Sequence, residues 1–113
     1  MKTKIKSLRD LNSFIKSLNS LNKSIVNNKS FSCITEKKRK YMRKNINLAS
    51  INAIRYITDA WICSANILQA HKDSLTPSTI LHIVNYMDEL ENYVKNIDDA
   101  NNYLTNWFKH GEY

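Results

Sequence analysis

Apolar residues recur along most of this chain at alternating steps of three and four residues, which is the period of an α-helix rather than of a β-strand. A first stretch of this kind extends from about Thr3 to Asn27 and ends at the polar run NNKS, residues 27–30. Its apolar positions are Leu8, Leu11, Ile15, Leu18 and Ile25. The pattern predicts one amphipathic helix over this stretch.

A second helix is predicted from about Glu36 to His71. Thr35 stands where an N-cap residue is expected, because its hydroxyl can accept a hydrogen bond from the first turn. The carboxylate of Glu36 suits the positive end of the helix dipole. This segment is long, and a break near residues 45–50 would divide it into two helices.

A third helix is predicted to begin in the sequence LTPSTI, residues 75–80. Thr76 is the expected N-cap, and Pro77 takes the first helical position, where its missing N–H group costs nothing. Apolar residues then keep the three-and-four spacing as far as Phe108, and Gly111 marks the expected end. The spacing predicts a single helix of about 30 residues, roughly 50 Å long.

Long helices joined by short links can bury their apolar stripes only against one another. We therefore predict an all-α fold, in which residues 1–113 form a single domain, an elongated antiparallel bundle of three long helices, or of four if the second helix breaks. One glycine and one proline also leave too few turn residues for a sheet of many short strands. The predicted central seam comprises Leu11, Ile15, Leu18, Ile54, Ile57, Trp61, Leu68, Met87, Leu90, Val94, Ile97 and Leu104.

Two asparagines interrupt the apolar stripes, Asn22 in the first helix and Asn101 in the third. In an up-down-up bundle these two helices are parallel, so both asparagines lie toward the same end. They either form a buried pair that fixes the register of the helices, or lie in water where the bundle frays.

Charge is divided unevenly along the chain. Residues 1–44 contain thirteen Lys or Arg and two acids, a net charge of +11, whereas residues 45–113 have a net charge of −4. A line of cations with a seven-residue period, the basic line, comprises Lys2, Arg9, Lys16 and Lys23. The run KKRKYMRK adds a basic cluster, which comprises Lys37, Lys38, Arg39, Lys40, Arg43 and Lys44.

These cations allow three interpretations. They could contact the phosphates of a nucleic acid without reading its sequence, because neutralised phosphates release counterions. The first helix could instead lie on an anionic membrane surface. Alternatively, the cations are solvated and partly balanced by acids of the third helix, in exposed pairs worth ~0–1 kcal/mol each. Those acids are Asp88, Glu89, Glu91, Asp98 and Asp99. Because cations are poorly placed at the start of a helix, the basic cluster requires either water or an acidic partner.

The sequence contains no pattern typical of catalysis. A single glycine excludes a glycine-rich phosphate-binding loop. Cys63 is expected in the core and Cys33 in a loop, and neither has an adjacent base. His71 and His82 flank the turn before the third helix, but they lack the spacing of helical metal ligands. We therefore predict no enzymatic activity, no cofactor and no metal site.

The third helix has more aromatic side chains than one seam requires. Tyr86, Tyr93 and Trp107 fall on a second line with a seven-residue period, and Tyr103 lies close to it. Tyr and Trp are enriched at protein interfaces, so these four residues are candidate partner-binding residues. The alternative is that the first and second helices cover this line.

The sequence favours a non-catalytic protein-binding factor, such as an adaptor, an inhibitor, an immunity-type protein or a regulatory protein. The alternative is a nucleic-acid-associated factor that binds phosphates through its basic N-terminal half. A homodimer is also expected, because two antiparallel copies could set each basic half against an acidic half. No stretch approaches the ~18 apolar residues of a membrane span, so insertion into a membrane is not expected. Without a signal-peptide core, the protein is expected in the cytoplasm, or outside the cell if exported without a cleaved signal.

Overall fold

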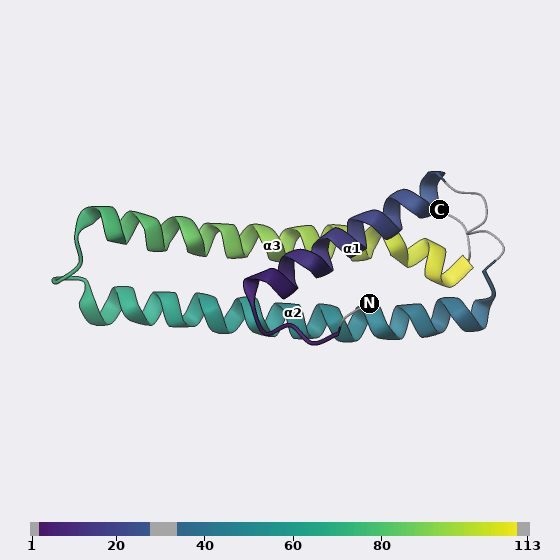
Figure 1. The fold of residues 1–113 in the computed structure, drawn as a ribbon, viewed down its shortest axis with the longest axis horizontal. Helices are drawn as coiled ribbons and strands as arrows, with labels where there is room; N and C mark the ends of the chain where they lie inside the picture. The colour runs from purple at the N-terminus through teal and green to yellow at the C-terminus, as the bar shows by residue number, and fades with distance from the viewer. Residues whose placement is uncertain (1–2, 28–33, 111–113) are drawn as a thin grey trace.

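The computed structural model describes residues 3–27 and 34–110, and these residues form three α-helices and no strand. The helices are α1 (Leu8–Asn27), α2 (Glu36–His71) and α3 (Pro77–His110). α2 and α3 form a long antiparallel hairpin, and α1 crosses one part of it obliquely, in the same direction as α3 (Figure 1). The predicted all-α antiparallel bundle is therefore confirmed.

α2 and α3 begin at the residues that the sequence predicts. The Thr35 side chain accepts a hydrogen bond from the Lys38 backbone N at 3.3 Å, and the Thr76 side chain accepts one from the Thr79 backbone N at 3.2 Å. Each bond satisfies an N–H group that the helix itself leaves unpaired. α2 continues without interruption through residues 45–50, so the described bundle has three helices and not four.

α1 begins at Leu8 rather than at Thr3 as predicted. The Ser7 side chain caps it, with its hydroxyl oxygen accepting a hydrogen bond from the Asp10 backbone N at 3.2 Å. The chain before Ser7 is held against α2 instead, because the Thr3 carbonyl oxygen accepts a hydrogen bond from Asn52 Nδ2 at 2.6 Å. Ile5, which is 9% exposed, joins the core from this segment.

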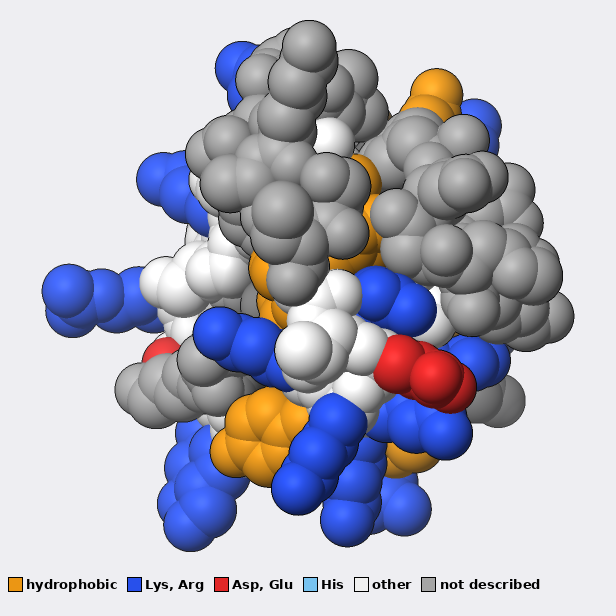
Figure 2. All heavy atoms as spheres, turned by 90° about the vertical axis from the view of Figure 1, so that its right-hand side faces the viewer, with side chains coloured by type: hydrophobic (Ala, Val, Ile, Leu, Met, Phe, Trp, Pro, Cys, Tyr) orange, Lys and Arg blue, Asp and Glu red, His pale blue; other side chains and the backbone are white. Residues whose placement is uncertain are grey.

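The molecule is elongated, with extents of 59 × 22 × 19 Å. The turn between α2 and α3, residues 72–76, forms one end, whereas α2 begins and α3 ends at the other (Figure 1). Figure 2 looks onto this second end, where Lys and Arg side chains project around the start of α2. We call residues 60–87, which α1 does not cover, the two-helix half. The other described residues, 3–27, 34–59 and 88–110, form the three-helix half.

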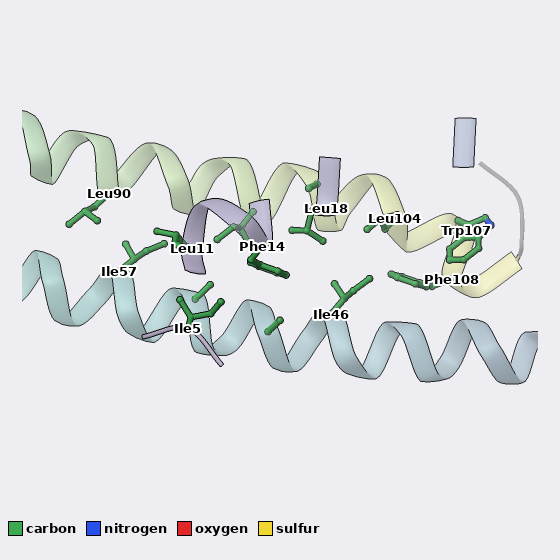
Figure 3. Close-up of a cluster of buried hydrophobic side chains, with 14 residues drawn as sticks. Ile5, Leu11, Phe14, Leu18, Ile46, Ile57, Leu90, Leu104, Trp107 and Phe108 are labelled. Carbon is green, nitrogen blue, oxygen red and sulfur yellow. The ribbon is translucent and has the colours of Figure 1, made fainter. Parts of the chain in front are cut away.

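The core lies mainly in the three-helix half. Figure 3 shows Leu11, Phe14 and Leu18 of α1 directed toward the hairpin, with Trp107 and Phe108 of α3 at the end of the cluster. The predicted seam residues that are buried are Leu11, Leu18, Ile57, Leu90, Ile97 and Leu104. Ile15 and Val94 are half-buried against them.

The core prediction is wrong toward the turn. Trp61 is 37% exposed, and Cys63, which was expected in the core, is also exposed. Ile54, Leu68 and Met87 are only half-buried. The reason is the length of α1, whose 20 residues span roughly 30 Å, against roughly 50 Å for the 34 residues of α3. α1 therefore leaves this part of the hairpin without a third helix.

One polar contact links α2 and α3 inside the bundle. Asn101 Nδ2 donates a hydrogen bond to Ser50 Oγ at 3.0 Å, and Ser50 is 6% exposed. Asn101 and Asn22 are both half-buried. Asn101 thus fixes the register of α3 against α2, because its bond to Ser50 forms at a single alignment of the two helices.

Candidate partner-binding surface

The basic cluster lies on the first turns of α2, and five of its members are exposed: Lys37, Lys38, Lys40, Arg43 and Lys44. Figure 2 shows these turns surrounded by basic side chains. Among the described residues, a single ion pair forms, between Lys40 Nζ and the Glu36 carboxylate at 3.4 Å, and both side chains are well exposed. The acids of α3 therefore do not pair with the cluster within the described part of the chain.

Arg39 differs from the other members of the basic cluster. It is half-buried, and its Nη1 donates a hydrogen bond to the Ile34 carbonyl oxygen at 2.7 Å. This bond holds the chain that enters α2 against the first turn of the helix. Arg39 therefore has a structural role at the start of α2, and the cluster presents five cations to a partner rather than six.

The basic line is exposed on α1 at Arg9, Lys16 and Lys23, whereas Lys2 lies outside the described residues. The opposite side of α1 carries the apolar stripe, and the hairpin already buries it, since Leu11 is 0% and Leu18 is 1% exposed. A membrane-bound α1 would have to withdraw this stripe from the core. No helix in the described part of the chain is long and apolar enough to span a membrane.

Apolar side chains lie directly beside the basic cluster. A shallow groove of about 430 Å³ is lined by Lys40, Arg43, Lys44, Asn47, Leu48 and Ile51. We call it the basic–apolar groove. Leu48 is 49% and Ile51 is 52% exposed, although the intervening Ala49 is completely buried. Apolar side chains with a rim of polar residues are a feature of interaction sites.

The sequence analysis missed Leu48 and Ile51. A signal for them was present. Leu48 falls between the buried positions Ile46 and Ala49, and Ile51 falls between the buried positions Ser50 and Ala53. Both also continue the three-and-four spacing of Lys44. The small alanines form the inner face of α2, so the larger aliphatic side chains face outward.

The four candidate aromatic residues do not form one exposed surface. Trp107 is 1% exposed and packs beside Phe108, with their ring centroids 5.3 Å apart, so the prediction that Trp107 contacts a partner is wrong. Tyr86 and Tyr93 are half-buried against the core, whereas Tyr103 is 64% exposed. The covered positions belong to the core because the other helices pack over this side of α3.

Two of these tyrosines have shifted pKa values. Burial raises the pKa of Tyr86 above its ordinary value, and the nearby Tyr56 side chain raises it further. Burial also raises the pKa of Tyr93, and so does the hydrogen bond that its hydroxyl donates to Glu89 Oε1 at 3.0 Å. Both hydroxyls therefore stay protonated at neutral pH, and their role here is packing and hydrogen bonding.

Within residues 3–27 and 34–110, no group of three or more His, Cys, Asp or Glu side chains is placed to hold a metal ion. His71 and His82 are both exposed. Cys63 is an exposed free thiol on α2, and Cys33 lies outside the described residues.

No protein-family model matches the chain, and neither a curated protein nor a solved structure matches it. The function of the groove must therefore be inferred from its own residues and geometry.

Proposed function

We propose that the protein is a non-catalytic factor that binds another protein through the basic–apolar groove. The observation that supports this function is the exposure of Leu48 and Ile51, at 49% and 52%, between the side chains of Lys40, Arg43 and Lys44. Protein interfaces combine an apolar centre with a polar rim in this way. An adaptor, an inhibitor, an immunity-type protein or a regulatory protein could each act through such a surface.

The chemistry of the groove defines its partner. Arg43 and Lys44 have no ion pair with a described residue, so acidic side chains of the partner can approach them without breaking an existing contact. Such rim charges mainly set the association rate and the orientation of the complex. Leu48 and Ile51 lie three residues apart on one helix, which suits an amphipathic helix of the partner with acidic residues beside its apolar stripe.

Capture from the native host tests this function. The full chain would be immobilised, and the proteins it retains would be compared between the wild type, Ile51→Glu and the matched control Ile67→Glu. Ile67 is 47% exposed, close to the 52% of Ile51, but lies far from the groove. We expect an acidic protein that the wild type and Ile67→Glu retain and that Ile51→Glu loses. Identical retention by all three chains contradicts the proposal.

Nucleic-acid binding is a second candidate function, which the exposure of the basic cluster and of Arg9, Lys16 and Lys23 favours. A mobility-shift titration with mixed-sequence duplex DNA tests it. Binding through phosphates weakens by orders of magnitude between about 50 mM and about 200 mM salt. Under this function Lys44→Glu weakens binding and Ile51→Ser leaves it unchanged, whereas protein binding through the groove requires both side chains.

A further inference from the structure

The two-helix half has an unusual combination of low charge and apolar exposure. Residues 60–71 and 74–87 contain no Asp, Glu, Lys or Arg, whereas residues 36–59 of α2 contain nine of them. Large apolar side chains are nevertheless exposed in the two-helix half: Trp61 (37%), Ile62 (47%), Ile67 (47%), Leu81 (60%) and Val84 (38%). Depletion of charge around exposed apolar side chains is the composition of an interface centre.

The boundary between the two halves is hollowed on one side, where α2 and α3 meet. A depression of about 210 Å³ is lined by Ile57, Thr58, Trp61, Glu91 and Val94. The same side continues toward the turn, because residues seven apart share a helix face. Leu68 lies seven residues after Trp61, and Val84 lies seven residues before Glu91. Met87 and Ile80 lie seven and fourteen residues before Val94. We call the surface formed by Trp61, Leu68, Ile80, Val84 and Met87 the hairpin face.

The hairpin face points away from α1 and its preceding segment. That segment lies on the side of α2 that carries Asn52 and Tyr56, which line a common hollow with Lys4 and Ile5. Thr58 follows Tyr56 by two residues, which places it roughly 200° around the helix. α1 therefore cannot cover the hairpin face without leaving its own binding position.

We propose that the hairpin face binds the same face of a second copy of this chain, so that two two-helix halves form a four-helix bundle. A surface without charge offers no electrostatic attraction to an acidic or basic partner, but it matches itself. A twofold arrangement also makes every contact twice, and it supplies each hairpin with the two additional helices that a closed bundle core requires.

Charge sets the orientation of the two copies. Outside residues 60–87 the chain carries sixteen Lys or Arg and nine acids, a net charge of +7, so two three-helix halves placed side by side would repel each other. An antiparallel arrangement sets them at opposite ends of the dimer and lets only the uncharged halves overlap. The overlap of residues 60–71 measures roughly 18 Å along helices that together are roughly 20 Å wide. The two copies together therefore bury on the order of 700 Å², which falls in the range of weak, reversible contacts.

This dimer uses a different surface from the basic–apolar groove and does not depend on the proposed function. It also differs from a dimer held by basic and acidic halves, since salt screens attraction between exposed charges. Contacts between uncharged apolar faces persist at high salt. Sedimentation velocity from low micromolar to a few hundred micromolar protein, at low and at high salt, separates the two kinds of dimer.

Tryptophan emission gives a second measurement on the same samples. Trp107 is already buried at 1% exposure, whereas Trp61 is 37% exposed. We expect the emission maximum to shift to shorter wavelength as the concentration rises, because dimer formation removes Trp61 from water. Trp61→Phe should abolish the shift, and the remaining Trp107 emission should not depend on concentration.

Two substitutions test the hairpin face directly. Val84→Glu and Trp61→Glu each place a charge on it at positions that are exposed in one chain, and we expect dimerisation to weaken at least ~10-fold, a loss of about 1.4 kcal/mol. Tyr41→Glu is the control, at a 66% exposed position in the three-helix half, and should dimerise like the wild type. Circular dichroism checks that all variants stay helical. A wild-type monomer at every concentration, or undiminished dimerisation of both charged variants, overturns the proposal.

Discussion

The three-helix half and the two-helix half are built from the same two helices, but they differ in what covers them. In the three-helix half, α2 buries Ile46, Ala49, Ser50, Ala53 and Ile57. Beyond Ala60, the same helix contains larger apolar side chains and yet buries Ser64 alone. The difference teaches that burial here depends on the reach of α1 and not on how apolar α2 is at each position.

The two halves also differ in the number of charged residues that they carry. The three-helix half buries most of its large apolar residues, apart from Leu48 and Ile51 in the basic–apolar groove and the exposed Tyr41 and Tyr103. Its outer surface carries the basic cluster and the acids of α3. The two-helix half leaves apolar residues exposed, and it carries no charged residue between residues 60 and 71 or between residues 74 and 87. A region that lacks both a covering helix and charge is thus the region in which a missing partner is expected.

The largest difference between the halves should appear when a large apolar side chain is truncated. Leu18→Ala, at 1% exposure in the three-helix half, should lower the free energy of unfolding by ~2–5 kcal/mol, because it creates a cavity as well as removing apolar contacts. Ile67→Ala, at 47% exposure in the two-helix half, should cost less than about 1 kcal/mol. Urea unfolding followed by circular dichroism measures both values.

An equal loss in the free energy of unfolding for these two substitutions would contradict the difference between the halves, because it would mean that the two-helix half is packed as tightly as the three-helix half. The measurement should be made at low protein concentration, so that self-association of the hairpin face does not add to the stability of the two-helix half.

Substitution of two buried serines of α2 should give an intermediate difference in the free energy of unfolding between the two halves. Ser50, in the three-helix half, accepts a hydrogen bond from Asn101 of α3. Ser64, in the two-helix half, donates to the Ala60 carbonyl oxygen within its own helix at 2.9 Å. Ser50→Ala should cost ~0.5–1.5 kcal/mol, because an interhelical bond is lost. Ser64→Ala should be close to neutral, because the backbone carbonyl keeps its helical bond.

The same unfolding measurements distinguish these two serine variants. A larger cost for Ser64→Ala than for Ser50→Ala would show that register is fixed in the two-helix half rather than through Asn101.

The sequence predicts the helices well because their signals are local. Thr35, Thr76 and Pro77 each act through bonds within the first turn of a helix, and the three-and-four spacing acts within neighbouring turns. The predicted start of α1 was wrong, although Ser7 carries a local signal through its bond with Asp10. The chain before Ser7 is kept out of the helix by the bond from Asn52 to Thr3. These two residues lie 49 positions apart, and no local pattern records such a contact.

The candidate surface could be predicted only in part. Exposure of the basic cluster follows from its composition, but the half-buried position of Arg39 depends on its bond to Ile34. Trp61 and Trp107 show a larger limit of prediction from the sequence. Each has the apolar character of a core residue, and one is 37% and the other 1% exposed. Which of the two is buried depends on the part of the hairpin that α1 covers, and that is a property of the whole bundle.

The smallest expected effect concerns the boundary between the halves, where the Tyr86 hydroxyl is half-buried. Its pKa is raised above the ordinary value of 10.0, chiefly by burial and further by Tyr56. The folded protein therefore keeps the phenol protonated at a pH where the unfolded chain already releases the proton. Stability from this group is complete below about pH 10 and decreases as the pH rises from there through the folded-state pKa. Unfolding by urea between about pH 8 and about pH 11 measures the decrease.

Tyr86→Phe is the matched control for this effect, because it keeps the aromatic ring and every other side chain and removes only the hydroxyl group. We expect the urea concentration at the midpoint of unfolding to decrease more steeply above pH 10 for the wild type than for Tyr86→Phe. Below pH 10, the midpoints of the two proteins should change with pH in parallel. Tyr103→Phe, at 64% exposure, should follow the wild type. Parallel lines for the wild type and Tyr86→Phe over the whole range would show that the boundary is open to water, and that the two-helix half extends further along the hairpin than α1 suggests.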